Sequence, residues 1–129
     1  MHAIGRHVWA IPEGYIPSRS VSDAPDLVSH EAASLLNTSD READVTITLF
    51  FKDREPAGPY RLKVGARRTL HMRFNDLTDP EPVPRDTSYA SVIESNEPIV
   101  VQHTRLDSRQ PGMALLSTVA YPVNGSTNS

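Results

Sequence analysis

The sequence contains no cysteine. This excludes a disulfide scaffold and any metal site with thiolate ligands, and it fits a reducing compartment. No stretch approaches the roughly 18 consecutive apolar residues that a membrane-spanning helix needs. Residues 1–10 lack the basic and then apolar pattern of a secretory signal. We therefore expect a cytoplasmic protein that does not insert into a membrane.

Lysine is also scarce, because Lys52 and Lys63 are the only lysines among 13 cationic side chains. Arginine suits planar, bidentate contact with carboxylate or phosphate groups, although genomic base composition explains the bias equally well. The formal net charge is −3, which disfavours a protein built mainly to coat nucleic acid. DNA contact through a local basic patch is therefore the weaker alternative.

No segment shows an apolar helical stripe over three turns, whereas strand patterns recur along the chain. In residues 44–52, Val45, Ile47 and Leu49 alternate with Thr46 and Thr48, as in a half-buried strand. Similar patterns predict strands at 7–11, 28–37, 60–64, 69–74, 89–94, 99–106 and 113–121. We expect 60–64 and 69–74 to form an antiparallel pair.

These strands predict an all-β fold: a single-domain antiparallel β-sandwich, jelly-roll-like, with about eight strands. The domain is expected to cover residues 1–123, and 124–129 to form a disordered Gly/Ser/Asn/Thr tail. Residues 113–121 are apolar on both faces, which suits either a central core strand or a strand between subunits.

Sequence signatures of catalysis are missing, including the Gly-x-Ser-x-Gly elbow, the phosphate-binding loop and His-Glu-x-x-His. The five histidines have no metal-ligand spacing; they are His2, His7, His30, His71 and His103. We therefore predict no enzyme activity, no catalytic residue, no metal and no cofactor.

An ordered series of sequence blocks resembles the sensory rhodopsin transducer family, a small cyanobacterial-type rhodopsin transducer and its wider bacterial relatives. The blocks include 4–6, 9–17, 29–31, 55–62, 66–69, 73–77 and 115–118. The most distinctive is 98–110, with the sequence PIVVQHTRLDSRQ. The resemblance extends over roughly residues 4–121 and lapses in the loop at 18–26 and after Tyr121.

The resemblance implies an all-β sandwich, a homotetramer and a role in signal transduction. It leaves two roles open. One is binding of a small, possibly sugar-like molecule, and the other is docking on the cytoplasmic face of a sensory rhodopsin.

Five residues are candidates for binding a ligand. Trp9, Glu13 and Tyr15 combine aromatic rings with a carboxylate, as a carbohydrate site requires. The competing interpretation is that the single tryptophan belongs to the core. His30 or Arg105 would complete the pocket; because His30 and Glu31 are adjacent on a predicted strand, they point to opposite faces.

Two polar rows are further candidates. Arg67, Arg68, His71 and Arg73 form an expected surface for an anion or an acidic partner, with a solvated outer face as the alternative. His103, Arg105 and Asp107 have i, i+2, i+4 spacing, which aligns them on one face of a strand. We expect His103 and Asp107 to belong to an interface or structural network.

Overall fold

The computed structural model describes residues 2–124 and consists almost entirely of antiparallel strands. The strands are β1 (Arg6–Gly14), β2 (His30–Asn37), β3 (Ala43–Phe50), β4 (Ala57–Val64), β5 (Arg68–Arg73), β6 (Tyr89–Asp107), β7 (Ala114–Val119) and β8 (Tyr121–Val123). Two short 3₁₀ turns complete the fold, η1 (Pro25–Leu27) and η2 (Phe74–Asp76). No helix in this part of the chain is long and apolar enough to cross a bilayer.

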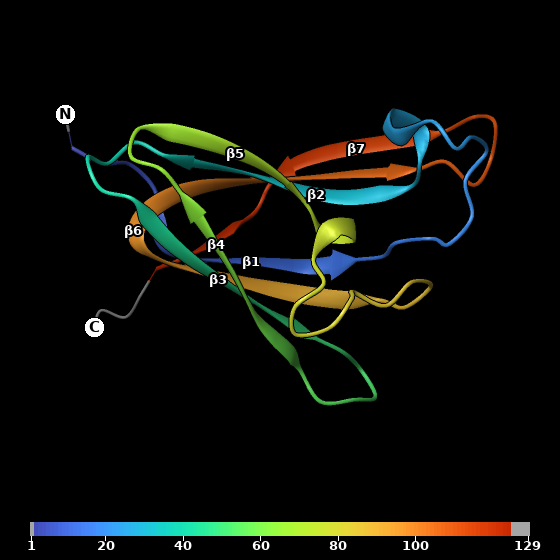
Figure 1. The fold of residues 1–129 in the computed structure, drawn as a ribbon, viewed down its shortest axis with the longest axis horizontal. Coiled ribbons are helices and arrows are strands. Elements are labelled where there is room, and N and C mark those ends of the chain that lie inside the picture. Colours follow the sequence, from blue (N-terminus) through green and yellow to red (C-terminus); the bar gives the residue numbers. More distant parts are fainter. Residues whose placement is uncertain (1, 125–129) are drawn as a thin grey trace.

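The strands form two layers, as predicted (Figure 1). We call them sheet A, with the order β4–β3–β6–β1–β8, and sheet B, with the order β5–β2–β6–β7. Strand β6 belongs to both. Its first half pairs with β1 and β3, the chain then curves, and its second half pairs with β2 and β7.

The apolar core lies between the two layers, and alternation along the strands places it there. Val45, Ile47 and Leu49 of β3 are buried, whereas Thr46 and Thr48 are half-buried on the other face. This confirms the pattern expected for residues 44–52.

The predicted number of strands is correct, but their division is not. Residues 89–94 and 99–106 belong to one strand, β6, because the ladder continues through the bend. Residues 113–121 instead divide at Ala120, whose N–H donates to the Val101 carbonyl at 3.0 Å where the chain passes from sheet B to sheet A.

The expected pairing of 60–64 with 69–74 is wrong. Strand β4 pairs with β3 in sheet A, and β5 pairs with β2 in sheet B. Arg67 has a left-handed φ of 54°, and the turn that contains it carries the chain from one layer to the other. A turn that changes layers looks like a hairpin in the sequence, since both have breaker residues between alternating runs.

Three loops meet at one end of the sandwich, on the right in Figure 1. The loop after β1 is joined to the loop before β6, because the Asp86 N–H donates to the Ile16 carbonyl at 2.9 Å. It is joined to the loop after β6 by the Val21 N–H, which donates to the Ser108 carbonyl at 2.7 Å. This loop end holds the polar residues described next.

Candidate functional site

A fully buried carboxylate, that of Glu31, lies near the start of β2. In the register of β2 and β6, Glu31 is opposite Arg105, and Ala33 is opposite His103. Because side chains two residues apart share a face, all four belong to the inner face of sheet B. The fold therefore brings two basic side chains to one buried acid.

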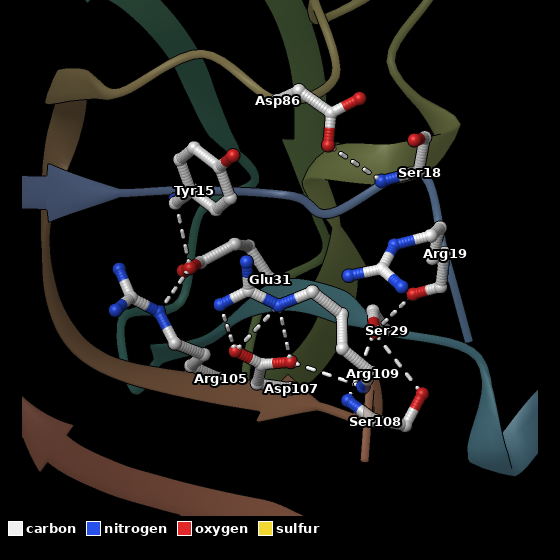
Figure 2. A network of polar contacts seen from close by, with 10 residues as sticks. All are labelled: Tyr15, Ser18, Arg19, Ser29, Glu31, Asp86, Arg105, Asp107, Ser108 and Arg109. Atoms are coloured by element: carbon white, nitrogen blue, oxygen red, sulfur yellow. Dashed lines mark hydrogen bonds and ion pairs between the residues drawn. The ribbon is translucent and has the colours of Figure 1, made fainter. Parts of the chain in front are cut away.

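Each oxygen of the Glu31 carboxylate is hydrogen-bonded. Oε1 is bonded to His103 Nε2, and Oε2 accepts from Arg105 Nε. Oε2 also accepts from the backbone N–H of Tyr15 at 3.0 Å, which fixes the loop after β1 (Figure 2). Such partners are what a buried charge needs in order to be tolerated.

Arg105 uses only one edge of its guanidinium in this network. Its Nε faces Glu31, whereas its terminal nitrogens form no hydrogen bond within residues 2–124 and reach away from the carboxylate (Figure 2). The side chain is 26% exposed. The two terminal NH2 groups of a charge-compensated guanidinium, with four N–H donors, thus remain free for a ligand.

The hydroxyl of Tyr89 is the second unusual feature of this end. It is buried and has no hydrogen-bond partner within the described residues. Burial raises the pKa of Tyr89, and the neighbouring Glu31 charge acts in the same direction. The ring lies across Gly14, where a Cβ atom would be 2.5 Å from the ring, so glycine is required there.

A surface ion pair lies beside the buried network. Arg109 holds Asp107 with two nitrogens, at 2.6 Å from Nη2 and 3.0 Å from Nε, and its guanidinium is 5.6 Å from the centre of the Tyr15 ring. The hydrogen bond from Arg109 lowers the pKa of Asp107. Beneath the pair, Ser29 and Ser108 bond to each other through their hydroxyls at 3.0 Å.

The loops after β1 and after β6 border an open polar hollow of about 200 Å³. Its lining consists of Arg19, Asp107, Arg109, Gln110, Gly112 and Ala114. We call it the polar hollow. Its charged donors and acceptors suit a ligand with several hydroxyl groups better than an apolar one.

Trp9 does not fit the predicted aromatic platform. The side chain is only 4% exposed, and its Nε1–H donates to the carbonyls of Arg6 at 3.1 Å and Ile99 at 2.9 Å. A ring without a free face cannot stack on a sugar. Trp9 is a core residue, and we correct this part of the prediction.

His30 is also displaced from the predicted pocket. It is directly opposite Leu106 on the outer face of sheet B, and its Nδ1 is 2.7 Å from the Val28 carbonyl. Its neighbour Glu31 points inward instead. Glu13 is exposed near the end of β1, whereas Tyr15 and Arg105 do meet around Glu31.

The polar row on β6 is arranged as its spacing indicates, but it has other partners. His103 and Arg105 share a face and both bond Glu31, whereas Asp107 pairs with Arg109. The sequence-based prediction did not include Glu31, which is the centre of this network. The sequence does contain a signal for it, because alternation places Glu31 on the same face as Ala33 and Leu35, and an acid on a core face needs cationic partners.

The four residues of the predicted basic surface do not converge. Arg67 pairs with Asp40 at 2.7 Å in the turn before β5, and Arg68 bonds backbone carbonyls nearby. Arg73 is at the other end of β5, roughly 17 Å from Arg68 along an extended strand. His71 bonds Ser34 at 3.1 Å. Among residues 2–124, no three His, Asp or Glu side chains are grouped as a metal site would need.

Comparison with known proteins found one matching family and similar solved structures. Residues 4–122 match the family model described as Anabaena sensory rhodopsin transducer. A solved structure of that name is 58% identical, with a TM-score of 0.74, covering 81% of this chain and 100% of the other. A structure described as Thermotoga maritima 1070 is 34% identical, with a TM-score of 0.82, covering 95% and 98%. The comparison with curated proteins gave no match.

These matches confirm the family resemblance and the all-β fold. The family model covers nearly all the described residues, and a relative sharing more than half of the aligned residues is matched over its entire length. This chain belongs to the Anabaena sensory rhodopsin transducer family.

Proposed function

We propose that this protein is a cytoplasmic signalling adaptor without enzyme activity, which binds a small, sugar-like molecule and relays its presence to a partner. The signalling role is supported by family membership. The observation that carries the ligand is the charged loop end, where Arg105 keeps its terminal nitrogens free and Asp107 and Arg109 line the polar hollow.

Glu31 gives this end a means of relaying binding. Its carboxylate joins the backbone of the loop after β1 to Arg105 on β6. A ligand that forms hydrogen bonds with Arg105 or with the Asp107–Arg109 pair therefore contacts residues that are bonded to both the loop and sheet B. The ligand has to favour one arrangement of this network to transmit a signal.

The ligand proposal predicts saturable binding of at least one mono- or disaccharide, measured by calorimetry and thermal shift. Asp107→Asn removes the charged acceptor from the polar hollow and releases Arg109, so we expect affinity to fall at least tenfold. Asp40→Asn is the matched control, because it makes the same change in an exposed pair with Arg67. Equal binding by both variants, or no binding across a carbohydrate panel, would contradict this ligand.

Docking on a membrane photoreceptor is the second candidate, favoured by the name of the 58% identical relative. Here we expect the purified protein to be retained by a detergent-solubilised sensory rhodopsin from the same source organism. An opsin of unrelated function is the control. Failure to bind such a rhodopsin, or the lack of an opsin gene in that genome, argues for the small-molecule role alone.

A further inference from the structure

An apolar groove lies between the edges of the two sheets, where the chain passes from β7 to β8. Its volume is about 480 Å³. It is lined by Ile11, Pro12, His103, Thr118, Val119, Ala120, Tyr121 and Pro122. Val119 and Tyr121 are 64% and 67% exposed, whereas Ile11 and Ala120 are buried, so the groove has an open rim and a buried floor.

His103 is the exception to this apolar lining. Its side chain is 8% exposed, and Nε2 is turned to Glu31. Its Nδ1 forms no hydrogen bond within residues 2–124, and protein atoms do not fully enclose this nitrogen. A buried ring with one unpaired nitrogen is therefore presented to the groove.

The partners of His103 determine what Nδ1 can bind. Glu31 accepts at Nε2, so Nε2 carries the proton and Nδ1 of the neutral ring is an acceptor. The Glu31 charge is already balanced by Arg105. With a neutral imidazole the cluster has no net charge, which favours an uncharged ligand that donates a hydrogen bond.

We infer that this groove binds a small, mainly apolar, uncharged molecule of the phenol class, whose hydroxyl donates to His103 Nδ1. An apolar cavity of about 150 Å³ takes up benzene, and ligand pockets commonly measure about 300–1,000 Å³, so the groove holds one or two rings. The site differs from the polar hollow in location and in chemistry.

Phenol and its methyl ether, anisole, test this inference by ligand-observed NMR titration. The two molecules have the same ring, but anisole has no donor. We expect phenol to bind saturably and roughly fivefold more tightly than anisole, since one hydrogen bond contributes on the order of 1 kcal/mol.

A filled groove provides the second arm of the experiment. Thr118 lines the groove and is exposed, so Thr118→Phe occupies it without touching Glu31. We expect phenol affinity to fall at least tenfold. Thr69→Phe makes the same change on β5, at the opposite edge of sheet B, and should bind as wild type.

Thermal unfolding verifies that both variants are folded. Three results overturn the inference: no saturable phenol binding by wild type, undiminished binding by Thr118→Phe, or anisole binding as tightly as phenol. Because the probe is a phenol, the outcome is separate from that of the carbohydrate experiment.

Discussion

Replacing Glu31 with glutamine is expected to lower the free energy of unfolding by about 3 kcal/mol. The side chain is fully buried, and both of its oxygens bond donors from β6. An amide keeps the shape of the side chain but removes its charge, so Arg105 loses its counter-ion. The amide NH2 group also replaces one carboxylate oxygen, so that a donor then faces the N–H of His103 or of Arg105. This loss of stability is at the lower end of the range for breaking a buried ion pair, because the Arg105 side chain is partly exposed to solvent.

Chemical denaturation measures this change, and the melting temperature should fall by roughly 10 °C for a domain of this size. Glu81→Gln is the matched control. Glu81 also holds an arginine with two bonds, to Arg54, but their side chains are 38% and 43% exposed. We expect the control to change stability much less than Glu31→Gln, because solvent screens an exposed ion pair. If the two variants are equally stable, the Glu31 network does not hold the loop end together.

Changing Leu115 to lysine is expected to dissociate the homotetramer, which we propose as the assembly of this protein. Every side chain of β7 is exposed within the single chain, including the adjacent Leu115 at 70% and Leu116 at 57%. Contiguous apolar surface of this kind marks interaction sites in folded proteins. The strand is also an edge with unpaired backbone groups.

Analytical ultracentrifugation across a concentration series measures the assembly. We expect wild type to sediment as a tetramer and Leu115→Lys to dissociate at concentrations at least tenfold higher, with unchanged stability of the protomer. Leu36→Lys places the same charge on the outer face of sheet B, where Leu36 is 38% exposed. A monomeric wild type, or a Leu115→Lys protein that assembles normally, would refute this interface.

The pattern of residues 113–121 suits either a core strand or a strand between subunits. A run that is apolar on both faces reports only that both faces avoid water in the functional state. Within residues 2–124 the structure excludes the core alternative for the single chain, because β7 lies at the edge of sheet B and pairs there only with β6. That leaves a partner as the proposed cover of the end of β7 that carries Leu115 and Leu116, whereas the groove lies at the other end, at Thr118 and Val119.

The local features of this protein can be predicted from the order of its residues. Alternation in β3 predicted which side chains are buried, since side-chain direction in a strand depends only on neighbouring residues. For the same reason it placed His103 and Arg105 on one face of β6. The family blocks were likewise readable because they are contiguous in the chain.

The residues that those faces contact depend on how distant strands pair. Glu31 is 72 residues from His103 and 74 from Arg105, so their contact depends on the pairing of β2 with β6. The indole N–H of the buried Trp9 donates to the carbonyl of Ile99, which is 90 residues away. The exchange of strands between layers at β6 and at Arg67 was equally hidden, because a turn in sequence does not specify the sheet to which the chain returns.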